Sequence, residues 1–138
     1  MKNSNATIQE KETNQKYIDG FVFPIHTEHL STYKKAAEEI ALIWKSYGAI
    51  AYTEYLGDDL FLQGTISFKK CLEANNDETI IFGWVEFPSR EIRDFANEQV
   101  AKDPRMPKLI EPLLNPVHPI FNASRMAYAG FRSFIDHN

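Results

Sequence analysis

The hydrophobic residues of this chain follow two periods, one typical of strands and one typical of helices. Segments with period two predict pleated strands, because successive side chains of a strand point to opposite faces. Segments with apolar residues at steps of three and four predict amphipathic helices. The predicted strands are 17–24, 49–56, 79–87 and 125–135, and the predicted helices are 28–47 and 90–102.

Turn and capping residues set the expected limits of these elements. Thr27 is a candidate cap for the first helix, and Gly48 suits the left-handed residue that commonly ends a helix. Pro88 ends the third strand and Ser89 can cap the next helix, which Asp103-Pro104 then stops. Residues 65–68 are read as a short strand or edge, and residues 106–114 as a further short helical piece.

The order strand, helix, strand, strand, helix, strand predicts an α+β fold. It corresponds to a ferredoxin-like βαββαβ sheet with both helices on one side. Period two divides each strand into a slim set and a large set of side chains. We expect the slim set to face the helices, since a helix packs closest where side chains are small. The slim set contains Gly20, Ala51, Gly83 and Ala129.

The large set would then form a strongly aromatic face on the far side of the sheet. A soluble monomer rarely exposes such a patch, so a second copy is expected to cover it. The sequence therefore predicts a homodimer with the architecture of a dimeric α/β barrel. The aromatic members of this set are Tyr17, Phe21, Phe23, Tyr52, Phe82, Trp84, Tyr128 and Phe134.

Candidate chemistry lies among the same large set. Asp19, Glu54 and Glu86 are in phase with the rings, and Arg132 supplies the opposite charge on the fourth strand. Desolvation would raise the pKa of a carboxyl group there, as an acid/base catalyst requires. Glu54 and Glu86 are therefore the candidate catalytic residues. The candidate ligand-binding residues, for a small planar or aromatic molecule, are Asp19, Tyr52, Trp84, Tyr128 and Arg132.

A structural role for these carboxylates is the competing interpretation. Asp19, Glu54 and Glu86 would then lie near strand ends, in contact with water or paired with Arg132 or Arg125 at the dimer seam. Such pairing satisfies a buried charge without any ligand.

Composition narrows the class of protein. The 138 residues suit one domain, with a polar tail over 1–15 and a folded domain over 16–138. The formal net charge of -4 disfavours nucleic acid as a partner. No run approaches the roughly 20 apolar residues of a membrane span, and the first residues do not resemble a signal sequence, so we expect a cytoplasmic protein with no membrane partner.

Motifs for cofactor or metal chemistry were not found. His26 and His29 have a possible ligand spacing at a helix start, but no third ligand can be named. Cys71 is the single cysteine, which excludes an intramolecular disulfide and a Cys-x-x-Cys pair. Phosphate-binding glycine loops and hydrolase elbows are likewise missing from the sequence. We therefore expect neither cofactor nor metal.

Several longer motifs carry a resemblance to a known family. YIDGFVFP, GAIAYTEYLGDD, GWVEFPSREIRD, AKDPRM and SRMAYAGF resemble the YbaA-like family of small bacterial proteins, over about residues 16–136. That family is similar to the dimeric α/β-barrel superfamily, which implies the same architecture, while its activity is not established. The chain departs from the family pattern at residues 61–64, at Ala129, at Arg132 and in a lengthened stretch over 111–122.

Two functions are consistent with these observations. The first is a small-molecule-binding homodimer, with cofactor-independent enzyme chemistry on a small planar or aromatic metabolite as its extension. The resemblance favours it, because related barrels include monooxygenases and isomerases that work without a metal or flavin. The alternative is a non-catalytic interaction or stress-related protein with a packed interior. A cavity between the sheet and its helices would separate the two.

Overall fold

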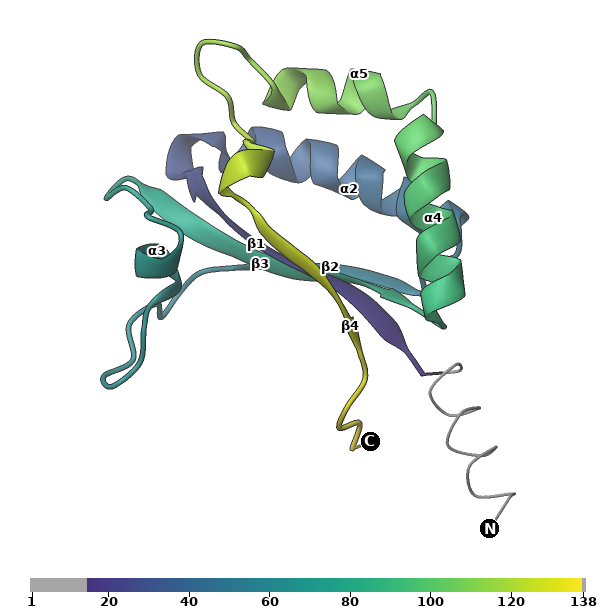
Figure 1. Ribbon diagram of the computed structural model, residues 1–138. Coiled ribbons are helices and arrows are strands. Elements are labelled where there is room, and N and C mark those ends of the chain that lie inside the picture. Colours follow the sequence, from purple (N-terminus) through teal and green to yellow (C-terminus); the bar gives the residue numbers. More distant parts are fainter. Residues whose placement is uncertain (1–14, 138) are drawn as a thin grey trace.

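The computed structural model describes residues 15–137, and its elements follow the order expected from the hydrophobic pattern (Figure 1). Short 3-10 turns at Thr27–His29, Glu111–Leu113 and Ala123–Arg125 link the longer elements. Those elements are β1 (Tyr17–His26), α2 (Leu30–Ser46), β2 (Ala51–Leu56), α3 (Phe68–Cys71), β3 (Glu78–Phe87), α4 (Arg90–Lys102), α5 (Met106–Ile110) and β4 (Ala127–Arg132).

The strands form one open antiparallel sheet in the order β2-β3-β1-β4. Helices α2 and α4 cover one face of this sheet, and α5 lies over α2 as an outer layer (Figure 1). We call the opposite side of the sheet the open face. The prediction of an α+β fold with a four-stranded antiparallel sheet is therefore confirmed.

Two predicted helix boundaries are confirmed by their local geometry. Ser89 Oγ accepts a hydrogen bond from the backbone N–H of Ile92 at 3.3 Å, which caps α4. Gly48 has a φ of 115°, and its N–H donates to the carbonyl of Lys45 at 3.2 Å, so glycine suits the turn that follows α2.

Two other local predictions are wrong. Thr27 does not cap the first helix, because it lies inside a 3-10 turn whose Glu28 N–H donates to His26 Nδ1 at 3.1 Å. Residues 65–68 form no strand. Instead, Ser67 Oγ accepts from Lys70 N–H at 3.1 Å and begins the short helix α3. His26 thus caps the 3-10 turn that precedes α2, and Ser67 caps a helix where a strand was expected.

The face assignment of the strands requires a larger correction. In the register of the sheet, Phe21 lies opposite both Gly83 and Tyr128, and Gly83 also lies opposite Glu54. These four residues therefore share the face beneath the helices. The large set of β1, β2 and β4 faces the helices, contrary to prediction. Only on β3 is the prediction correct, since Trp84 lies on the open face.

The physical reason is visible at Gly83. A methyl group added there would approach Phe21 Cζ to 2.8 Å and Glu54 Cγ to 2.9 Å. The missing side chain thus makes room for large side chains of the two neighbouring strands, not for the backbone of a helix. Small residues on one strand and large residues on the next share a face and fill it together.

The core lies between this face and the helices. Phe23 and Phe87 are almost fully buried, and their rings meet Tyr33 and Trp44 of α2 at centroid distances of 5.3 Å and 6.2 Å. Phe121, from the long connection before β4, meets Phe23 edge-on at 5.3 Å. Each buried ring contributes about 2–3 kcal/mol through lost apolar surface. This packing fixes α2 over the sheet.

The predicted polar tail falls on residues 1–15, of which 1–14 lie outside the described residues. In the part of the chain that the structure describes, every helix is too short or too polar to cross a bilayer.

Candidate functional site

A cavity of about 420 Å³ lies between α2 and the edge strand β2, on the helix side of the sheet. Its walls are largely apolar, and its polar groups are phenols, carboxyl groups and one ammonium group. The lining residues are Leu30, Tyr33, Lys34, Ala37, Glu38, Ala41, Tyr52, Glu54, Tyr55, Leu56 and Ile81.

Glu54 is the polar centre of this cavity. The hydroxyl of Tyr33 donates a hydrogen bond to Glu54 Oε1, and the hydroxyl of Tyr52 is a second hydrogen-bonding neighbour of the carboxyl group. Burial raises the pKa of Glu54, and the two phenol hydrogen bonds partly oppose that shift. The result is a carboxyl group that gains and loses its proton closer to neutral pH than an exposed one.

The two phenols are held in their neutral form. Burial, followed by the nearby charge of Glu54, raises the pKa of both Tyr33 and Tyr52. Both hydroxyls therefore remain hydrogen-bond donors at neutral pH. They come from different elements, Tyr33 from α2 and Tyr52 from β2, so the packing of helix against strand sets their geometry around Glu54.

Charged residues of α2 mark the outer side of the cavity. Lys34 and Glu38 are one helical turn apart, both are exposed, and both contribute to its lining.

A second carboxylate lies on the same face of the sheet, in a different environment. Asp19 is completely buried, accepts a hydrogen bond from Arg93 Nε at 2.7 Å, and accepts another from the Tyr128 hydroxyl at 2.5 Å. Arg93 also donates to Asp94 at 2.7 Å and lies over the ring of Tyr17, 4.9 Å from its centre. The charge of Asp19 is therefore neutralised inside the protein.

Glycine makes this ion pair possible. Gly130 is the cross-strand partner of Asp19 in β4. A methyl group at Gly130 would come within 2.2 Å of Arg93 Nη2 and 2.3 Å of the Tyr17 hydroxyl. The guanidinium group thus occupies the volume that any other residue would fill.

Phe21 separates the two carboxylate sites. Its ring centre is 6.4 Å from that of Tyr52 and 6.5 Å from that of Tyr128. Asp19 and Glu54 therefore share a face, as predicted, but each has its own partners. Asp19 is fully satisfied by Arg93 and Tyr128, whereas Glu54 borders a cavity.

The remaining predicted site residues lie elsewhere. Glu86 and Trp84 are on the open face, so the prediction that Glu86 is in phase with Asp19 and Glu54 is wrong. The cause is the register, which pairs Ala51 and Ile18 with Glu86. Glu86 and Arg132 both line a separate cavity of about 290 Å³ near the end of β1. Phe131, Ile135 and Asp136 are among its other lining residues.

The arginine partners also differ from the expected ones. Arg125 forms a two-pronged ion pair with Glu78, at 2.6 Å and 2.8 Å, and lowers the pKa of that carboxyl group. Asp19 takes Arg93 of α4 instead of Arg125 or Arg132. Asp19 pairs with a residue of a helix because its side chain lies on the face of the sheet that the helices cover.

Sequence reasoning missed two residues of these sites. The apolar spacing of residues 28–47 does not mark Tyr33 as a partner of Glu54, and the local sequence does not pair Arg93 with Asp19. A signal for Arg93 exists, because Asp19 lies among apolar strand residues and a buried carboxylate there needs a cation. Arg93 lies one residue after Ile92, which is on the buried stripe of α4.

The histidines near the start of α2 have other partners. His26 Nε2 lies 2.9 Å from Asp77 Oδ2, while His26 Nδ1 accepts from Glu28. Within residues 15–137, no group of three or more His, Cys, Asp or Glu side chains is placed to hold a metal ion.

Known proteins resemble this chain in sequence and in fold. The chain is 34% identical over 121 residues to "Uncharacterized protein YbaA" of Escherichia coli K12 and to its counterpart in Shigella flexneri, covering 88% of this chain and 98% of each relative. A crystal structure of a nipsnap family protein of unknown function from Agrobacterium tumefaciens has a similar fold, with a TM-score of 0.52 at 13% identity, over 87% of this chain and 89% of that one. Residues 16–115 match the family described as "Protein of unknown function (DUF1428)". The chain therefore belongs to this YbaA-like family, DUF1428, whose function is unknown.

Proposed function

We propose that this protein binds a small planar or aromatic molecule in the Glu54 cavity and works as a homodimer. The observation that carries the proposal is the cavity of about 420 Å³ between α2 and β2, with a partly buried carboxyl group and two phenols in its wall. Its size falls within the range of small-molecule sites, about 300–1,000 Å³. A packed interior would have favoured the alternative of a purely interacting protein.

The lining supports a planar ligand. Aliphatic side chains and the rings of Tyr33 and Tyr52 supply flat apolar contact, while the polar groups concentrate at Glu54. A ligand with an apolar body and one hydrogen-bonding group matches this distribution, because few placed polar groups orient a ligand in an apolar pocket.

Catalysis is the extension of this proposal. Glu54 would accept or return a proton, since its raised pKa brings it towards the range useful for acid/base chemistry. Tyr33 and Tyr52 would hold the carboxyl group in place through the hydrogen bonds that their hydroxyls make with it. Glu86 and Trp84 have no part in this pocket, because they are on the other face of the sheet.

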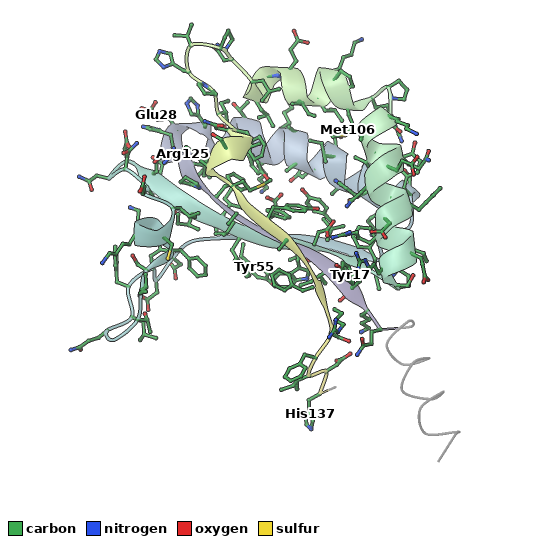
Figure 2. All side chains as sticks on the ribbon, in the orientation of Figure 1. Tyr17, Glu28, Tyr55, Met106, Arg125 and His137 are labelled. Atoms are coloured by element: carbon green, nitrogen blue, oxygen red, sulfur yellow. The ribbon has the colours of Figure 1, made fainter. Side chains whose placement is uncertain are left out.

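The dimer follows from the open face. Phe82, Trp84 and Tyr55 form a continuous group of rings there, with centroid distances of 6.0 Å and 5.3 Å. Figure 2 places Tyr55 on the side of the sheet away from the helices. A second sheet packed on this side would create the ferredoxin-like dimeric α/β barrel that the resemblance implies, and would bury rings that water now contacts.

The experiment is a thermal-shift screen with planar aromatic acids, amines and phenols on purified protein. We expect some compounds to raise the Tm of the wild type, and Glu54→Gln and Tyr33→Phe to weaken that rise. Glu86→Gln is the matched control, since it removes a carboxylate from the open face and should leave the rise intact.

Two results would contradict the proposal. One is a panel in which no compound stabilises the wild type. The other is a set of hits whose effect is the same in Glu54→Gln as in the wild type. Turnover of a hit that is lost in Glu54→Gln but retained in Glu86→Gln would extend the proposal from binding to catalysis.

A further inference from the structure

An apolar arm projects from the sheet between β2 and β3. The arm, residues 57–71, ends in α3 and lies on the side of the sheet away from α2 and α4 (Figure 1). Phe61, Leu62 and Ile66 near its tip are each 72% exposed. The stretch from Leu60 to Ser67 contains no charged residue. Such a segment is unusual on a surface that contacts only water.

The base of the arm is fixed to the sheet. Gly57 N–H donates to the carbonyl of Ile80 at 2.8 Å, and the Phe68 ring lies 5.8 Å from that of Phe82. Phe82 in turn contacts Trp84 on the open face. The apolar surface of the arm is therefore continuous with the rings of the open face, and both lie on the same side of the sheet.

We propose that the arm is a clasp, whose tip packs on the open face of a second copy of this chain. This inference rests on the dimer of the proposed function and identifies what completes its interface. In a two-fold arrangement each copy would supply one arm and receive the other. The contact made by Phe61 and Leu62 would therefore occur twice in the dimer.

The exposed areas favour a second copy as the occupant. Tyr55, Phe82 and Phe131 of the open face are 55%, 42% and 55% exposed. At roughly 200 Å² for a whole large side chain, these rings supply about 300 Å² per copy. The four exposed large apolar side chains of the arm supply about 500 Å² more on the same scale, and they are Phe61, Leu62, Ile66 and Phe68. The total of about 800 Å² matches what each partner buries in a standard stable interface, which the open face alone does not reach.

The experiment measures the dimer dissociation constant of the full chain by sedimentation equilibrium. We expect Phe61→Ser with Leu62→Ser to raise this constant by about 100-fold or more, because apolar contacts at both arms are lost. The matched control is Leu42→Ser, which removes an exposed leucine from α2 on the other side of the sheet. It should leave the constant unchanged.

A third variant, Phe131→Asp, tests the open face independently, since Phe131 lies opposite Ile18 on that face. If Phe131→Asp is monomeric while the arm variant dimerises like the wild type, the clasp is wrong and the open-face dimer stands. If the wild type is monomeric at high concentration, both are wrong. Equal weakening by the arm variant and Leu42→Ser would also overturn the clasp. All four substituted positions in these three variants are exposed, and circular dichroism checks that each variant remains folded.

Discussion

Asp19 and Gly130 are cross-strand partners, and Arg93 occupies the volume above the glycine to reach the carboxylate. Two strands and one helix therefore meet at a single charge pair. The pair connects α4 to β1, and the hydrogen bond from Tyr128 to Asp19 adds the edge strand β4, whose neighbour in the sheet is β1. Its loss should be felt in the stability of the whole domain.

Replacing Arg93 tests this connection. Arg93→Leu should lower the free energy of unfolding by about 3–5 kcal/mol, because Asp19 would remain buried without its cation. Arg90→Leu is the control, since Arg90 is exposed and its contact with Asp94 is 3.8 Å long. It should cost less than about 0.5 kcal/mol. Urea denaturation of the three proteins gives the comparison, and equal midpoints would disprove a structural role for the pair.

Gly130→Ala should destabilise the protein by about 1–3 kcal/mol, since the added methyl group collides with Arg93 and Tyr17 and must displace the guanidinium group. Gly20→Ala is the comparison within the same sheet. Its methyl group would meet only the ring of Phe131 at 3.2 Å, which is exposed and can move. The Tm of Gly130→Ala should therefore be well below the Tm of Gly20→Ala. The reverse order would show that Arg93 does not need the space above Gly130.

Glu54 should make stability fall as pH rises. Its pKa is raised above the ordinary value of 4.5 by burial, so between that value and the higher folded pKa the folded state binds more protons than the unfolded state. The free energy of unfolding therefore decreases with pH across this window. Glu54→Gln should remove that decrease. Denaturation of both proteins from pH 4 to pH 8 measures it, and parallel pH profiles would show that Glu54 titrates normally.

Glu78 should have the opposite effect on the pH profile. The hydrogen bonds from Arg125 lower its pKa below 4.5, so its contribution is present above that value and is lost as pH falls through the folded pKa. Glu78→Gln should flatten the acid limb of the stability curve. Asp58→Asn, which removes an exposed carboxylate from the segment after β2, is the control that should leave this limb in place. If the acid limb is unchanged in Glu78→Gln, then groups other than Glu78 cause the loss of stability at low pH.

Local structure was largely readable from the sequence because it depends on near neighbours. The alternation of Ile80 to Phe87 fixes a strand, and Ser89 can cap the helix after it whatever the rest of the chain does. The presence of a carboxylate on β2 and another on β1 was also visible, and both do lie on one face.

The sequence by itself determined the order of strands and helices and the two-sided character of each strand, since a period of two or of 3.6 is a property of consecutive residues. The tertiary structure decided which sides share a face. That choice depends on the pairing register, and a shift of one residue moves every side chain to the other face. Here the register placed the Phe21 ring where a side chain at position 83 would lie, and the Arg93 guanidinium group where a side chain at position 130 would lie. It also left Glu54 beside a cavity and Glu86 on the opposite face.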